Sequence, residues 1–208
     1  MAAPRDGDRR RSQARCRGRA REVGVNVQIA FLRGVGHGPG DMLDMPALRE
    51  ALAEAGFAAV RTYLGSGNVV LLDDGEPGVL AARVGEILQK RFDRDIHVIV
   101  RSLDELSEAV ARNPFPDAAA DAEHYNVAFL ETTLDQAEVE QLAVLATGRE
   151  RVAVIGRELY GWYPDGFAGS RLIGGIMGLP VPATARDWTT VTGVLDLARE
   201  VRAENRSR

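Results

Sequence analysis

One stretch decides the fold class of this chain: Arg61-Thr62-Tyr63-Leu64-Gly65-Ser66-Gly67-Asn68-Val69-Val70-Leu71-Leu72. Residues that favour strands stand on both sides of a Gly-Ser-Gly-Asn cluster, which supplies positive φ angles and local side-chain hydrogen bonds where a chain reverses. The stretch therefore predicts a β-hairpin with Gly67 at a positive φ angle. Because loops on a rigid scaffold often carry function, Ser66 and Asn68 at its tip are candidate ligand-binding residues.

The segments around this hairpin predict a first lobe over residues 25–113. Its elements are strands at 25–31, in both arms of the hairpin and at 96–100, and helices at 45–55 and 80–88. Apolar residues recur at every second position in the predicted strands and at every third or fourth position in the predicted helices. Asp44 is in the position of an N-cap. The order β-α-β-β-α-β is that of a ferredoxin-like unit. Ser102-x-x-Glu105 has the spacing of a capping box and predicts a further helix that ends at Asn113-Pro114.

The second half of the chain repeats this order. Residues 114–124 are rich in proline, alanine and acidic residues and predict a linker. A second lobe is then predicted over residues 125–200, with strands at 125–130, 151–155 and 159–163 and helices at 135–146, after Ser170 and from Trp188. Residues 201–208 are expected to form a disordered C-terminal tail. We therefore predict an α+β protein of two ferredoxin-like lobes, with antiparallel sheets and helices on one face of each sheet.

Length and composition indicate a globular protein. The chain has 208 residues, of which 45% are apolar, enough for a core in one or two domains. Its apolar runs are shorter than the roughly 18 residues of a membrane helix, so we expect no membrane segment. Cys16 is the single cysteine, which excludes an internal disulfide and a cysteine-based zinc cluster and favours the cytoplasm. His37, His97 and His124 have no metal-ligand spacing, so we expect neither a metal nor a cofactor.

Charge is divided unevenly along the chain. Residues 1–24 hold eight arginines and three acidic residues, a net charge of +5, so the total of −4 leaves −9 for the remainder. Because residues 1–24 have almost no apolar side chains, we predict a disordered basic tail. The tail is either an arm for nucleic acid or a segment absent from the natural chain, which would then start near Val23, Val25 or Val27. The acidic remainder disfavours nucleic acid as its partner, because phosphate neutralisation dominates such binding.

Five groups of short motifs occur in order along the chain. They are Leu32-Arg33-Gly34-Val35; Thr62-Tyr63 with Ser66-Gly67-Asn68-Val69-Val70; Asn113-Pro114-Phe115-Pro116; Gly156-Arg157-Glu158-Leu159-Tyr160 with Tyr163-Pro164-Asp165-Gly166; and Thr184-Ala185-Arg186-Asp187-Trp188 with Thr190-Val191. Together they resemble the domain-of-unknown-function 1697 family of bacterial proteins, over residues 25–200. The resemblance implies an α+β fold and no established activity. The chain departs from the family after Gly34, where asparagine and lysines are usual, and at Asp187, where asparagine is usual.

Familiar catalytic motifs do not occur in the sequence. Gly65-Ser66-Gly67 lacks the glycine spacing of a nucleophile elbow, and Lys90, the single lysine, stands outside any phosphate-binding loop. Pro39 interrupts the glycine pattern that a dinucleotide site requires. The catalytic residues are therefore unassigned, and the sequence leaves open whether the chain is an enzyme.

Two arginines near loops predict an anion site. Arg33 ends the first strand beside a glycine-rich loop, and Arg171 follows Ser170 at the start of a short helix. An arginine fork together with free backbone amides can hold an anion. With Ser66 and Asn68 these arginines form the predicted ligand-binding set. Our hypothesis is a binding module for a small anionic ligand such as a nucleotide; the alternatives are a phosphate-handling enzyme and a ligand-free protein-interaction scaffold.

Three residues of the second lobe have structural interpretations. Asp187 is expected to be the N-cap of the last helix, with Trp188 in the core behind it. Tyr160 and Trp162 alternate onto one face of a strand, as base-stacking aromatics do, but the first lobe has no such pair. We therefore expect them to pack between the lobes or against the last helix. The sequence leaves the oligomeric state open.

Overall fold

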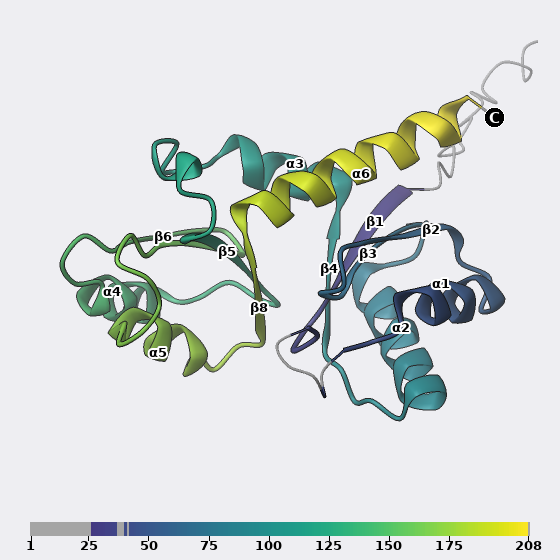
Figure 1. Cartoon of the computed structure of the whole chain (residues 1–208), viewed down its shortest axis with the longest axis horizontal. Helices are drawn as coiled ribbons and strands as arrows, with labels where there is room; N and C mark the ends of the chain where they lie inside the picture. The colour runs from purple at the N-terminus through teal and green to yellow at the C-terminus, as the bar shows by residue number, and fades with distance from the viewer. Residues whose placement is uncertain (1–25, 37–39, 41, 208) are drawn as a thin grey trace, which may run out of the picture.

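The structure is a computed structural model that describes residues 26–36, 40 and 42–207. Within them the chain is an α+β fold with two four-stranded antiparallel sheets and six α-helices (Figure 1). The first lobe contains β1 (Asn26–Leu32), α1 (Met45–Glu54), β2 (Ala58–Tyr63), β3 (Asn68–Asp73), α2 (Pro77–Phe92), β4 (Val98–Ser102) and α3 (Leu103–Ala111). The second contains β5 (Tyr125–Leu130), α4 (Gln136–Leu145), β6 (Arg151–Ile155), β7 (Glu158–Trp162), α5 (Arg171–Met177), β8 (Ala183–Asp187) and α6 (Trp188–Arg206). The predicted basic tail at residues 1–24 lies outside the described residues.

The two sheets follow one plan. Sheet A has the order β2-β3-β1-β4 and sheet B the order β6-β7-β5-β8. Their registers also agree: Phe31 lies opposite Asn68, as Phe129 lies opposite Glu158, and Ile29 lies opposite Arg101, as Val127 lies opposite Arg186. The first, third and fourth strands of one lobe therefore have structural counterparts in the other.

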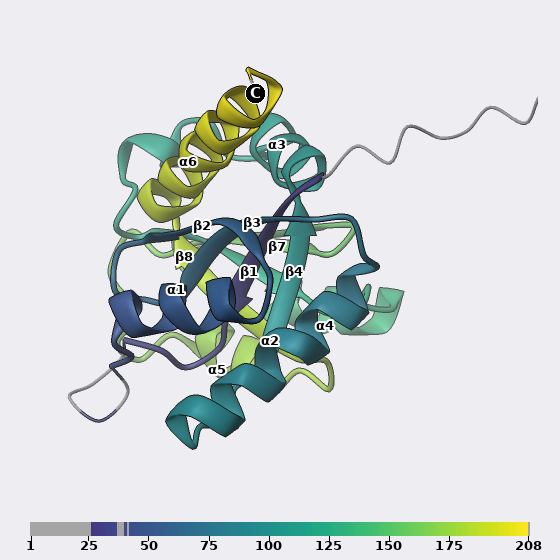
Figure 2. The ribbon, with the colours of Figure 1, turned by 90° about the vertical axis from the view of Figure 1, so that its right-hand side faces the viewer.

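Helices cover both faces of sheet A. Residues such as Leu32 and Leu71 pack against α1 and α2, whereas Ile29 and Val70, on the opposite face, pack into a core shared with α6. Figure 2 shows α1 and α2 in front of sheet A, with α3 and α6 above it. The prediction that helices lie on one face alone is wrong for this sheet, because α6 of the second lobe crosses onto the remaining apolar face.

The lobes share one hydrophobic core. At its centre Phe31 and Phe129 stack with ring centroids 4.2 Å apart and planes 8° from parallel. Tyr160 is buried between the lobes, as expected, and its hydroxyl donates to the Ala109 carbonyl in α3 at 2.7 Å. Trp162 packs at the edge of this core, where its Nε1 donates to Asp121 and Arg151 lies over its ring. Neither aromatic residue forms an open base-stacking surface.

The hairpin prediction is confirmed. β2 ends at Tyr63 and β3 begins at Asn68, and Gly67 has a φ angle of +72°. A Cβ atom at Gly67 would lie 2.8 Å from the Leu32 Cβ and 3.0 Å from the Val35 Cβ. Glycine is therefore required at this position both by its backbone angle and by the close approach of β1.

The predicted helix caps are also confirmed. The Asp44 side chain accepts from the N–H of Ala47, and the Asp187 side chain accepts from the N–H of Thr190. Ser102 and Glu105 form the reciprocal bonds of a capping box. Polar residues at short spacings in the sequence thus predicted correctly where three helices begin.

Three segments differ from their predictions. The 114–124 segment contains a 3-10 turn, Ala118–Ala120, and Ala118 is fully buried, so this part of the predicted linker packs on the core. Strand β8 was not located in the sequence. The predicted disordered tail from residue 201 is wrong as far as Arg206, because Val201 extends the buried stripe of α6.

Candidate functional site

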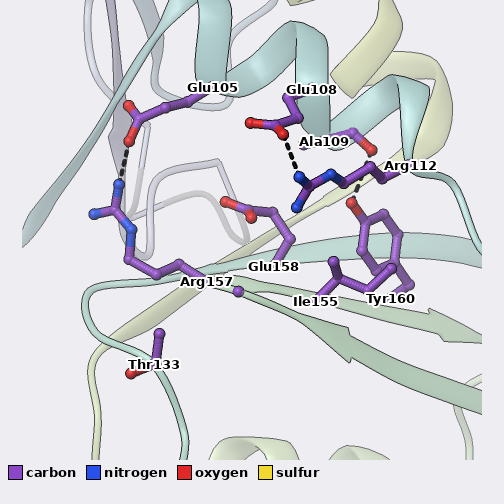
Figure 3. Close-up of a pocket in the computed structure, with 10 residues that line it drawn as sticks. Glu105, Glu108, Ala109, Arg112, Thr133, Ile155, Arg157, Glu158 and Tyr160 are labelled. Atoms are coloured by element: carbon purple, nitrogen blue, oxygen red, sulfur yellow. Dashed lines mark hydrogen bonds and ion pairs between the residues drawn. The ribbon is translucent and has the colours of Figure 1, made fainter.

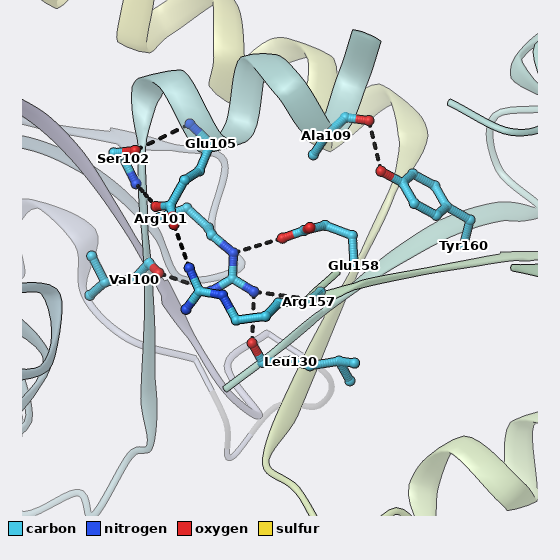
Figure 4. A network of polar contacts seen from close by, with 9 residues as sticks. All are labelled: Val100, Arg101, Ser102, Glu105, Ala109, Leu130, Arg157, Glu158 and Tyr160. Carbon is cyan, nitrogen blue, oxygen red and sulfur yellow. Dashed lines mark hydrogen bonds and ion pairs between the residues drawn. The ribbon is translucent and has the colours of Figure 1, made fainter. Parts of the chain in front are cut away.

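Arg101, on β4, inserts into the tip of the β6–β7 hairpin of the other lobe (Figure 4). Its side chain is 1% exposed. Nε donates to Glu158 Oε1 at 2.8 Å, and Nη2 donates to the carbonyls of Leu130 at 2.7 Å and Arg157 at 3.1 Å. Nη1 donates to the carbonyl of Val100 at 3.0 Å. The guanidinium thus joins one lobe to the other through a carboxylate and backbone oxygens.

Arg186, on β8, makes the reciprocal insertion into the β2–β3 hairpin. Nε donates to Asn68 Oδ1 at 2.6 Å, and Nη2 donates to the carbonyls of Leu32 at 2.9 Å and Gly67 at 3.3 Å. Nη1 donates to the Ala185 carbonyl at 2.7 Å and to Thr184 Oγ1 at 2.8 Å. All five N–H donors of this guanidinium are engaged, each by a neutral oxygen.

The two arginine sites differ in charge. Glu158 balances Arg101, whereas the counterpart of Glu158 is Asn68, and within the described residues no carboxylate forms an ion pair with Arg186. Burial lowers the pKa of Arg186 to about 10, and the nearby carboxylate of Asp187 opposes that shift only in part. The side chain remains protonated at neutral pH. A buried positive charge without a paired carboxylate therefore lies in the β8 wall of the lobe junction.

A polar cleft of about 320 Å³ lies beside Arg101, between α3 and the β6–β7 turn (Figure 3). Glu105 and Glu108 project from α3 into this cleft, where Glu105 pairs with Arg157 and Glu108 pairs with Arg112. Burial alone would raise the pKa of Glu105, but hydrogen bonds from Ser102 and the charge of Arg157 outweigh it and lower that pKa. The charged groups that line this cleft are thus paired with one another or with Arg101.

A second cavity, which we call the Arg33 cavity, has a volume of about 430 Å³ and lies where β1 ends and β8 begins, near the lobe junction. Its lining comes from the end of β1, from β5, and from the stretch that joins α5 to β8: Arg33, Gly34, Ala128, Ile176, Met177, Leu179, Pro180, Val181, Pro182, Ala183, Thr184 and Ala185. The guanidinium of Arg33 is exposed and makes no hydrogen bond or ion pair with another described residue. Arg186 follows the lining residues Thr184 and Ala185 and bonds to both.

The structure distributes the four predicted ligand-binding residues over different environments. Arg33 lines the cavity. Asn68 is fully buried, and its amide donates to the Tyr63 carbonyl and to Ser66 Oγ, both at 3.1 Å, while its oxygen accepts from Arg186. Arg171 is exposed at the start of α5, six residues and about 9 Å along the helix from Met177, and does not line this cavity. Asn68 therefore positions Arg186, and Arg33 is the member of the set that faces the cavity.

Sequence reasoning missed the two inserted arginines, although a signal for them exists. Ala30-Phe31-Leu32 recurs as Ala128-Phe129-Leu130, at structurally equivalent positions of β1 and β5. Arg101 and Arg186 each stand immediately before a helix N-cap, Ser102 and Asp187. The repeated triplet together with an arginine before a cap would have indicated the internal duplication and both arginines.

Within the described part of the chain, no helix is both long and apolar enough to cross a membrane. The same residues contain no group of three or more histidine, cysteine, aspartate or glutamate side chains placed to hold a metal ion.

Comparisons with known proteins agree with the fold. The chain is similar to a conserved bacterial protein of Streptococcus pneumoniae, with 18% identity and a TM-score of 0.66 over 84% of this chain and 99% of that one. The small subunit of acetolactate synthase from Thermotoga maritima aligns over 78% of this chain and 96% of that one, with 16% identity and a TM-score of 0.22. No curated protein matches the chain. A family model matches residues 25–160, more than half of the sequence, and the chain therefore belongs to the family described as "Protein of unknown function (DUF1697)".

Proposed function

We propose that this protein is a binding module for a small anionic ligand, which it holds in the Arg33 cavity. The observation that carries the proposal is the placement of two guanidinium groups without carboxylate partners at one cavity, in the described part of a chain whose net charge is −4. Arg33 lines the cavity, and its side-chain donors bond to no other residue that the structure describes. Arg186, next to the lining residue Ala185, adds a buried charge that Asp187 offsets only in part.

The two arginines have different roles in this proposal. Arg33 contacts the anion, because no described residue bonds to its side-chain N–H groups and a guanidinium can bind a carboxylate or phosphate through two parallel hydrogen bonds. Arg186 has no donor left for a ligand. Its charge acts through space, and the attraction is stronger inside the protein than in water because the effective dielectric constant is lower.

Glu131 is the acidic residue that the proposal has to accommodate. Its N–H donates to the carbonyl of Pro182, a lining residue, so its backbone lies close to the cavity. Its carboxylate, however, lies 3.2 Å from His97 Nε2, within ion-pair range although without hydrogen-bond geometry. Glu131 therefore has a cationic partner of its own whenever His97 is protonated.

Thermal unfolding of the full-length chain tests the proposal. The probes are AMP, NAD, a sugar phosphate, inorganic phosphate and simple carboxylates, at fixed ionic strength. A ligand at about a hundred times its Kd stabilises the native state by about 2.7 kcal/mol, which for a chain of this size raises Tm by about 5 to 11 °C. Arg33→Ala should remove the shift and change the ligand-free Tm little, because exposed arginines usually contribute within about 0.5 kcal/mol.

Two further arginine variants complete the design. Arg91→Ala removes an exposed arginine of α2 that does not line the cavity and should retain the full shift. Arg171→Ala decides whether the second predicted arginine takes part in binding. If no anion shifts Tm, or if Arg33→Ala and Arg91→Ala respond equally, the proposal is wrong. Concentration-dependent self-association in light scattering would then favour the scaffold alternative, and turnover of a phosphate probe would favour the enzyme.

We further infer that each lobe is a ferredoxin-like unit followed by one additional helix. The support is the strand order, in which the second, third, first and fourth strands of each lobe follow one another across an antiparallel sheet. The additional helices, α3 and α6, cover the junction between the lobes, which explains why helices occur on both faces of sheet A.

A further inference from the structure

We infer that the ligand of the Arg33 cavity is a monoanion with an apolar body, such as an aliphatic or aromatic carboxylate, rather than a nucleotide. The inference rests on the proposed function and specifies its ligand class. It depends on the chemistry of the other residues that line the cavity, which is an observation separate from the two arginines.

Polar side chains are scarce in this wall. Of the twelve residues that line the cavity, Arg33 and Thr184 alone have polar side chains. The Thr184 hydroxyl already accepts a hydrogen bond from Arg186. A nucleotide presents a ribose, the polar edge of a base and one or more phosphates, and burial of such groups without partners is unfavourable. A ligand with one anionic group can place that group against Arg33 and its hydrocarbon part against the apolar side chains of the wall.

The apolar part of the wall is held in place by the chain itself. It consists of the end of α5 and the connection to β8, where Pro180 and Pro182 restrict the backbone. Ile176 and Leu179 pack against the core of the second lobe. A wall of this kind needs little ordering when a ligand binds, and preorganisation of a site increases affinity.

The size of the cavity agrees with this class of ligand. Small-molecule sites enclose about 300 to 1,000 Å³ and are mostly apolar, with a few polar groups that fix orientation. The Arg33 cavity, at about 430 Å³, falls in the lower part of this range.

The experiment measures the affinity of the full-length chain for acetate, butanoate, hexanoate and octanoate by calorimetry. Hexanamide serves as the uncharged counterpart of hexanoate, and AMP and inorganic phosphate represent the alternative class. We expect affinity to rise about three- to fourfold per methylene until the cavity is filled. Hexanoate should bind more tightly than AMP. Arg33→Ala should weaken hexanoate at least tenfold and hexanamide less than twofold.

A second variant tests the wall. Ala185 is exposed in β8 and lines the cavity, so Ala185→Leu should fill part of its volume without disturbing the core. It should weaken hexanoate at least tenfold and acetate less than twofold. Affinity without chain-length dependence, or hexanoate binding insensitive to both variants, would overturn the inference. Tighter, Arg33-dependent binding of AMP or phosphate would overturn it while leaving the proposed function intact, whereas no binding of any anion would remove both.

Discussion

Arg101 and Arg186 occupy equivalent positions in the two lobes and make nearly the same backbone contacts, but they end in different electrostatic situations. Arg101 donates to a carboxylate, Glu158, whereas Arg186 donates to an amide oxygen, that of Asn68. The cleft beside Arg101 contains paired charges, whereas the cavity beside Arg186 contains Arg33, whose guanidinium has no partner among the described residues. One architecture thus provides a joint of paired charges at one site and, at the other, a buried arginine that bonds to neutral oxygens beside a cavity lined by Arg33.

The difference extends to neighbouring positions. By register and hydrogen bonding, Thr190 stands where Glu105 stands in the first lobe, and Gly67 stands where Arg157 stands in the second. The Glu105–Arg157 ion pair therefore has no counterpart at the Arg186 site. Exchange of a few side chains on a duplicated frame is enough to separate a structural site from a candidate binding site.

The largest expected effect comes from removing each inserted arginine in turn. Arg101→Met leaves the Glu158 carboxylate without its partner and should destabilise the fold by about 4 kcal/mol, as for other broken buried pairs. Arg186→Met loses hydrogen bonds but also relieves an uncompensated buried charge, so we expect about 2 kcal/mol. Urea unfolding at neutral pH measures both values. Equal losses, or a larger loss at Arg186, would contradict the electrostatic difference between the two sites.

The next effect concerns the two hairpin tips. Gly67→Val forces a branched side chain into a left-handed backbone angle and against β1, so we expect a loss of about 3 kcal/mol from strain and overpacking. Arg157→Val is the matched variant of the other tip, where the backbone angle is ordinary. It should lose only a partly exposed ion pair, about 1 kcal/mol or less. Urea unfolding measures both losses. Equal unfolding midpoints for Gly67→Val and Arg157→Val would show that the two hairpin tips do not differ in their need for glycine.

The predictable parts of this fold are those that local patterns determine. The alternation of apolar and polar residues predicted β1 and the hairpin. Polar residues at short spacings predicted the helix caps at Asp44, Ser102 and Asp187. Strand β8 was missed because its two buried positions are Thr184 and Arg186, so its polar residues point inward and the usual alternation is inverted.

The candidate site was less predictable because its contacts are distant in sequence. Arg186 meets Asn68 across 118 positions, and Arg101 meets Glu158 across 57. Arg33 was identified from its place after a strand and before a glycine-rich loop. The role of Asn68 as a support for Arg186, and the apolar wall after α5, depend on how the lobes pack against each other, which no local pattern encodes.

The smallest expected effect is a pH dependence confined to the Arg101 site. Glu105 has a pKa below its ordinary value of 4.5, so its stabilising contribution is complete above that value and is lost as the pH falls through the lower pKa of the folded state.

Because the side chain is partly exposed, Glu105→Gln should cost about 1 kcal/mol or less at neutral pH. Its difference from the parent should shrink as the pH falls below 4.5, because the parent carboxylate then takes up a proton and both chains approach a neutral side chain at this position. Glu108→Gln removes a more exposed carboxylate from the same helix and cleft and should change stability by less than about 0.5 kcal/mol at either pH. A deficit of Glu105→Gln that persists unchanged down to the acid limit of folding would show that the bonds of Glu105 to Ser102 and Arg157 do not depend on charge, and the distinction between the two arginine sites would then rest on Glu158 and Asn68 alone.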